Sequence, residues 1–189
     1  MKRVQQRILL EKQKEVLEQY DSYESEEIET HWPKYAKSIG EFLISFSILE
    51  SSLNRMIVEF VDHRADDEGF RIIKYLRFKS KIDFASEKCR LLIGFIGKDS
   101  KRKLNKAKLD LIIRRLKEIS EFRNKIVHAN WSTLKKGFVM VKIDTDEQGW
   151  INFKNVKMTP FIIRKLIRET DTLIIKIEDF QERLEQDLN

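Results

Sequence analysis

Residues 104–127 read LNKAKLDLIIRRLKEISEFRNKIV, and this stretch decides the fold of the chain. Its apolar residues recur at helical spacing, so they fall on one face of an α-helix. That face consists of Leu104, Leu111, Ile112, Leu116, Ile119, Phe122 and Ile126. We therefore predict a long amphipathic helix whose apolar side needs other helices to cover it.

Three further stretches carry the same periodicity. They run from residue 35 to about 63, from 70 to 96 with an interruption near Lys79 and Ser80, and from 160 to about 188. Thr159 and Pro160 give the last of these helices an N-cap and a proline at its first position. The segments between the helices, 66–69 and 98–103, are predicted to be a short link and a basic loop.

The pattern changes between the third and the last long helix. Residues 138–143 and 150–156 are rich in β-forming side chains, and turn residues at 144–149 separate them, which indicates a β-hairpin. The whole chain has only 6 Gly and 2 Pro, too few for a β-sandwich, a β-barrel or a nucleotide fold built on glycine loops. We predict an all-α fold, a helical bundle with a small β-hairpin inserted before the last helix.

The 189 residues suit one domain with an appendage. Residues 1–29 have a weak apolar face, and Pro33 disfavours helix at the residue before it. We therefore divide the chain into an N-terminal helical extension, residues 1–32, and a bundle, residues 33–189.

The single cysteine and the short apolar stretches indicate a cytoplasmic protein. A single cysteine, Cys89, cannot form an internal disulfide, and no apolar stretch approaches the roughly 20 residues that span a bilayer. The net charge of +6 leans toward polyanionic partners, although ordinary surface charge accounts for it equally well. The three histidines, His31, His63 and His128, are scattered, so we expect no metal site and no cofactor.

One short motif carries chemistry. Arg123 is followed after four residues by His128, near the end of the long helix. Attack of an RNA 2′-hydroxyl on the neighbouring phosphate needs proton transfer, which a histidine performs near neutral pH. It also needs stabilisation of an anionic phosphorane, which an arginine provides through two parallel hydrogen bonds. Neither step requires a metal.

This motif resembles the defining motif of the HEPN superfamily, an Arg followed after four to six residues by a His. Asn is frequent directly after the Arg in that family, as Asn124 is here, and the segment from Gly40 to Glu50 looks like a first bundle helix of such proteins. The resemblance covers about residues 35–185. It implies a helical bundle that dimerises with its motifs facing each other, and in many members a metal-independent endoribonuclease that acts as a toxin or antiviral effector.

The resemblance also fixes the expected site. Arg123 and His128 would be catalytic, and Asn124 would position the substrate or His128. Other HEPN proteins lack the activity and serve as binding partners, commonly of a nucleotidyltransferase antitoxin. We therefore expect RNA as substrate, or alternatively a non-catalytic binding module in a toxin–antitoxin or defence complex, with no membrane partner. A generic helical scaffold that self-associates is a third interpretation.

Helical geometry bears on this site. At about 100° per residue, Asn124 and His128 share a face, whereas Arg123 is about 140° from His128. A homodimer would gather both groups into one cleft. Glu50 interrupts the apolar face of the first bundle helix, so we expect it to hold Arg123 or to orient His128, or else to form a buried structural ion pair.

Ordinary structural roles also account for these side chains. A histidine at a helix C-terminus is favourable whatever its job, and an arginine at the edge of an apolar stripe can extend its stem across it. Lys79 and Lys81 would bind backbone phosphate or, as solvated residues, no ligand. Trp131 is interpreted as a core residue.

Overall fold

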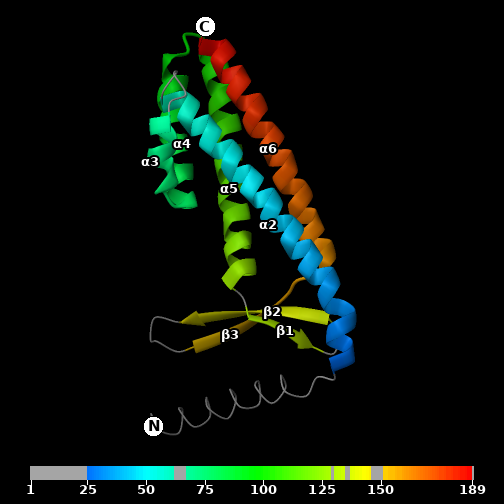
Figure 1. Cartoon of the computed structure of the whole chain (residues 1–189). Helices are drawn as coiled ribbons and strands as arrows, with labels where there is room; N and C mark the ends of the chain where they lie inside the picture. The colour runs from blue at the N-terminus through cyan, green and yellow to red at the C-terminus, as the bar shows by residue number, and fades with distance from the viewer. Residues whose placement is uncertain (1–24, 62–66, 129, 135–136, 146–150, 189) are drawn as a thin grey trace, which may run out of the picture. The chain divides into compact units, whose positions relative to one another are not determined.

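The computed structural model describes residues 25–61, 67–128, 130–134, 137–145 and 151–188. The chain divides into two compact units (Figure 1). One, which we call the helical unit, contains residues 40–125 and 164–189; the other, the strand unit, contains residues 1–39 and 126–163. In chain order the elements are α2 (Ser25–Val61), α3 (Asp67–Lys74), α4 (Phe78–Phe95), α5 (Asp99–His128), β1 (Asn130–Leu134), β2 (Gly137–Thr145), β3 (Ile151–Lys157) and α6 (Pro160–Leu188).

The helical unit is a bundle, which confirms the helical class expected from the sequence. Its core is apolar, and its fully buried side chains include Phe42, Leu49, Leu53, Met56, Ile57, Ile82, Leu109, Leu116, Ile177, Phe180 and Leu184. Cys89 is also fully buried, and burial raises the pKa of its thiol to about 12. The thiol therefore stays protonated at neutral pH and packs as a small apolar group.

The buried face of α5 differs slightly from the stripe that the sequence indicates. Leu109, Ile112, Leu116 and Ile119 are buried as the periodicity requires, but Leu104 and Leu111 are 43% and 39% exposed. At about 100° per residue, Leu111 is roughly 140° from Leu116 around the helix, so it lies at the edge of the covered side. The centre of that side is polar at one point, because Asn105 is fully buried there.

Polar contacts between helices fix how the bundle is arranged. The Asn105 side-chain amide donates a hydrogen bond to Asp187 at 2.8 Å, and Lys101 pairs with the same carboxylate at 2.8 Å. The start of α5 therefore lies beside the end of α6, and the two helices run in opposite directions (Figure 1). Those two hydrogen bonds lower the pKa of Asp187, which keeps this carboxylate ionised. On the opposite side of α6, the Ser45 hydroxyl donates to Asp171 at 2.6 Å.

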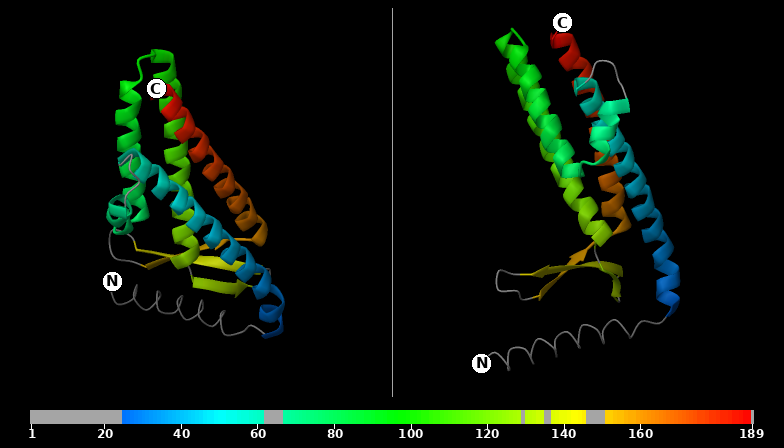
Figure 2. Two further views of the ribbon diagram at one scale, coloured as in Figure 1. Left: turned by 45° about the horizontal axis from the view of Figure 1, so that its top comes forward. Right: turned by 60° about the vertical axis from the view of Figure 1, so that its left-hand side comes forward.

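The strand unit contains an antiparallel sheet in the order β1-β2-β3 (Figure 2). Strands β2 and β3 occupy the two stretches that the sequence marks as β-rich, while β1, which pairs with β2, lies outside those two stretches. Trp131 of β1 is half-buried, its ring lies 6.4 Å from that of Tyr35, and its indole N–H donates to the carbonyl of Ile126 at 3.1 Å. Trp131 is therefore packed against its neighbours but is not fully buried, as the expected core position would require.

The expected boundary at Pro33 is wrong, because α2 continues through that proline from Ser25. A proline removes one backbone donor and crowds the preceding turn, but a 37-residue helix retains its hydrogen bonds on either side. The limit between the two units falls instead after Ile39. Residues 1–24 of the expected N-terminal extension lie outside the described residues.

Two expected connections are also helical. The predicted basic loop, residues 98–103, belongs almost wholly to α5, which begins at Asp99. The Asp99 carboxylate pairs with Arg102 at 3.4 Å and with Lys103 at 2.9 Å, and an acidic side chain in the first turn stabilises a helix start. Likewise α3 already includes residues 67–69, and the break between α3 and α4 is at residues 75–77 rather than near Lys79. None of the described helices is long and apolar enough to cross a membrane.

Candidate functional site

Arg123 lies on the buried side of α5. It follows Leu116 by seven residues, so helical geometry places the two side chains within about 20° of one another around the helix axis. The other helices of the bundle cover this side of α5, and Arg123 is therefore only partly exposed. A guanidinium always carries its charge, so the surrounding residues must accommodate a cation.

An aromatic ring accommodates it. The central guanidinium carbon of Arg123 lies 5.7 Å from the centroid of the Phe46 ring on α2. Phe46 is itself buried, and the ring of Phe78 on α4 lies 4.8 Å from it. A cation over an aromatic face is attracted by the ring quadrupole. The remaining polar contact of Arg123 is local, since Nη1 donates to the side-chain oxygen of Asn124 at 3.3 Å.

Glu50 does not hold Arg123, contrary to the first of the alternatives offered by its place in the sequence. Its carboxylate accepts a hydrogen bond from the ammonium of Lys81 on α4 at 2.6 Å. Lys81 has only 6% of its side chain exposed, against 35% for Glu50. Lys81 is therefore not the solvated residue that its sequence context indicated, and the third alternative, a structural ion pair, describes Glu50.

Asn124 and His128 lie on the outer side of α5, where both are exposed. His128 is the last residue of the helix, and its imidazole makes no hydrogen bond with the described part of the chain. On the helix alone, Arg123 and His128 stay about 140° apart.

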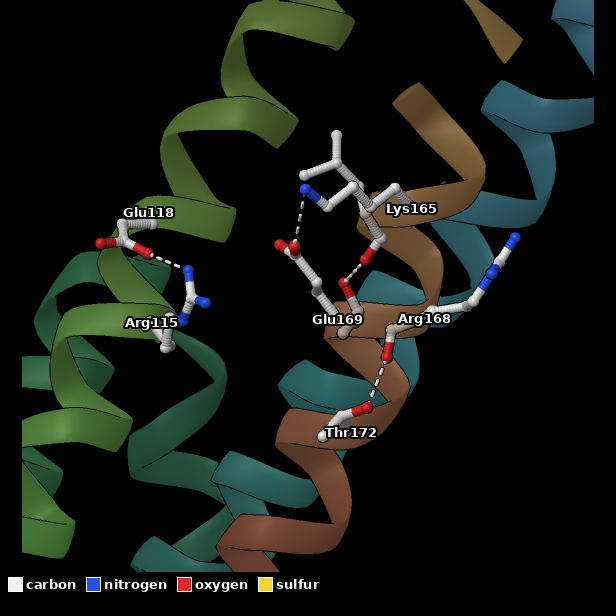
Figure 3. Close-up of polar contacts among 8 residues, drawn as sticks. Arg115, Glu118, Lys165, Arg168, Glu169 and Thr172 are labelled. Carbon is white, nitrogen blue, oxygen red and sulfur yellow. Dashed lines mark hydrogen bonds and ion pairs between the residues drawn. The ribbon is translucent and has the colours of Figure 1, made fainter. Parts of the chain in front are cut away.

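A shallow groove lies between α5 and α6, separate from the Arg-x4-His motif. Figure 3 shows its polar rim: Arg115 pairs with Glu118 at 2.7 Å and Lys165 with Glu169 at 3.9 Å. The cavity volume is about 210 Å³, and the lining residues are Leu111, Ile112, Arg115, Ile119, Lys165, Arg168, Glu169, Thr172, Leu173 and Lys176. Sequence periodicity does not indicate this groove, because its cations are spread over two helices that are distant in the chain.

Within the described residues, no cluster of His, Cys, Asp and Glu side chains could hold a metal ion. Comparisons with protein-family models, with curated proteins and with solved structures each found no match to this chain.

The Glu50–Lys81 pair gives the first testable prediction. Glu50→Gln should lower the free energy of unfolding by about 1.5–3 kcal/mol, because it leaves the buried Lys81 ammonium with a weaker partner. Combining it with Lys81→Met should recover much of that loss, since replacing both members of a buried pair by groups of similar shape is often nearly neutral. Urea unfolding followed by circular dichroism measures all three variants.

The matched control is Asp110→Asn, which breaks the exposed pair between Asp110 and Arg90 and should cost at most about 1 kcal/mol. Equal losses for Glu50→Gln and Asp110→Asn would show that the Lys81 pair has no special role in the bundle.

Proposed function

We propose that this protein is a metal-independent endoribonuclease of the HEPN type, a toxin or defence effector that acts as a homodimer. The observation that carries the proposal is how the arginine and the histidine of the Arg-x4-His motif are placed. The arginine is partly buried and braced by an aromatic ring, while the histidine is exposed at the end of the same helix. A structural arginine would gain more from a carboxylate partner, and none is bonded to Arg123 within the described residues.

In the proposed reaction the 2′-oxygen of the RNA bonds to the adjacent phosphorus, and its proton passes to the imidazole of His128. The bond from phosphorus to O5′ then breaks, and a protonated imidazole, His128 of the partner subunit, delivers a proton to the leaving oxygen. Arg123 stabilises the charge on the phosphorane oxygens. Asn124, hydrogen-bonded to Arg123, positions the substrate. The products are a 2′,3′-cyclic phosphate and a 5′-hydroxyl.

A second candidate function is a non-catalytic binding module in a toxin–antitoxin or defence complex, in which a nucleotidyltransferase or another antitoxin is the partner. The open groove between α5 and α6 favours this alternative, because it presents a binding surface without any catalytic group. The two functions are compatible in one protein, since the groove and the motif use different residues.

Substitutions in the motif test the nuclease. His128→Ala should reduce RNA cleavage by about 10²–10⁴-fold, the usual loss when acid–base catalysis is removed. Its melting temperature should change little, because the imidazole is exposed. Arg123→Lys should also lose activity, since an ammonium cannot form the planar pair of hydrogen bonds.

Arg114→Lys, on the exposed side of the same helix, is the control for Arg123→Lys. Cleavage by His128→Ala at the parental rate would contradict the nuclease and favour the binding module.

The aromatic brace gives a separate prediction. Phe46→Leu should lower kcat by about tenfold, because a cation–π contact contributes on the order of 1–2 kcal/mol when partly desolvated. Phe42→Leu is the matched control, one turn earlier on α2 and also buried, but with no cation on its ring among the described residues. Both variants should lose similar stability in thermal unfolding, and only Phe46→Leu should lose kcat at unchanged KM. Equal kcat values for the two variants would remove Phe46 from the site.

A further inference from the structure

The groove between α5 and α6 combines an aliphatic floor with a cationic rim. Leu111, Ile112, Ile119 and Leu173 supply aliphatic side chains, of which Leu111 is 39% exposed and the other three are buried. Arg115, Lys165, Arg168 and Lys176 carry positive charge along the edges, against a single carboxylate, Glu169, in the lining. Most of the residues that line the groove are exposed, so the groove is open to solvent.

The four cations are not equivalent. Glu118 accepts a hydrogen bond from Arg115, and the pKa of Arg115 is raised by that contact. Glu169 lies 3.9 Å from Lys165. Arg168 and Lys176, in contrast, have no acidic partner among the described residues. They are eight residues apart on α6, a separation of about 12 Å along the helix axis.

Thr172 lies on α6 midway between these two cations. The Thr172 hydroxyl donates to the backbone carbonyl of Arg168 at 2.7 Å, as the lower dashed line in Figure 3 shows. Because its hydroxyl hydrogen is used within the helix, Thr172 offers the groove mainly its methyl group. The stretch between Arg168 and Lys176 therefore presents the Thr172 methyl group in its centre and a cation at each end, with the Glu169 carboxylate next to Arg168.

The size and chemistry of the groove narrow the class of ligand. Its volume, about 210 Å³, is below the roughly 300–1,000 Å³ of small-molecule pockets. Among the described residues, no aromatic side chain lines the groove, whereas sites for single-stranded nucleic acid stack bases on aromatic rings. An aliphatic floor between cations is complementary to a peptide helix with an apolar stripe and acidic flanks.

We propose that this groove binds an acidic amphipathic helix of a partner protein. The apolar stripe of the peptide lies on Leu111, the exposed aliphatic side chain of the floor. Two of its carboxylates, seven or eight residues apart, reach Arg168 and Lys176. The proposal is independent of the ribonuclease, because no groove residue belongs to the Arg-x4-His motif.

Fluorescence anisotropy with the full chain tests the proposal. The probe is a labelled synthetic 18-residue peptide with leucines at helical spacing and glutamates seven residues apart, and the reference probe is a scrambled peptide of the same composition. The intact chain should bind the amphipathic peptide at least tenfold more tightly than the scrambled one. Equal affinities, or no binding by the amphipathic peptide, would overturn the proposal.

Charge reversals locate the binding site. The double variant Arg168→Glu, Lys176→Glu should weaken peptide binding by about tenfold or more, because two attractions become repulsions. The control is Arg114→Glu, Arg164→Glu, which changes the net charge equally through one exposed residue on each helix outside the groove. An equal loss in the control would show that only overall charge matters, and would contradict the groove as the site.

Two further measurements test the floor of the groove and its selectivity for a peptide over nucleic acid. Leu111→Ser should weaken peptide binding while the circular dichroism spectrum is unchanged, since Leu111 contributes to the floor without being part of the buried core. A labelled single-stranded RNA should bind the Arg168, Lys176 variant and the Arg114, Arg164 control alike. If the RNA, and not the peptide, loses affinity specifically through Arg168 and Lys176, the groove is a nucleic-acid surface and the proposal is wrong.

Discussion

A charged residue on the buried side of α5 is the constraint on which the candidate site depends. Arg123 continues the line of Leu109 and Leu116, both fully buried, and its guanidinium lies beside the Phe46 ring of α2 and is only partly exposed. Water cannot fully solvate it there, and an unpaired charge in that position would be costly. The Phe46 ring, 5.7 Å away, and the Asn124 amide offset that cost without neutralising the charge. A cation held in this way keeps its attraction for an anionic ligand.

The same bundle treats a second cation differently. Lys81 is more deeply buried than Arg123, and it is matched by a full negative charge, Glu50, at 2.6 Å. The two charges neutralise one another. The pair therefore links α2 to α4 and leaves little positive charge to attract a ligand. Because of this contrast, Arg123 and not Lys81 belongs to the proposed ribonuclease site. Phe46 and Glu50, one turn apart on α2, support the two cations.

The sequence predicts the helices well wherever local signals agree. Thr159 caps α6 as expected, its hydroxyl accepting a hydrogen bond from the backbone N–H of Ile162 at 3.3 Å. The failures come from long-range contacts. Residues 98–103 resemble a basic loop in the sequence. In the structure Lys101 pairs with Asp187 and Lys103 pairs with Asp99, and the segment from Asp99 onward is helical. The charges of Glu50 and Arg123 on apolar helix faces suggest that the two residues pair, but Glu50 pairs with Lys81 and Arg123 lies over Phe46. Periodicity within one helix cannot tell which neighbouring helix supplies a partner. The groove cations, shared between α5 and α6, escape sequence reasoning for the same reason.

The chemistry of the RNA ends tests the proposed ribonuclease most directly. The intact protein is incubated with a labelled single-stranded RNA in excess EDTA, together with a matched DNA strand and an RNA carrying a single 2′-deoxy nucleotide at the cleaved position. The proposed mechanism predicts RNA fragments that end in 2′,3′-cyclic phosphate and begin with 5′-hydroxyl, with the DNA and the substituted bond intact. Cleavage that requires added magnesium, or that proceeds at the 2′-deoxy position, would contradict it.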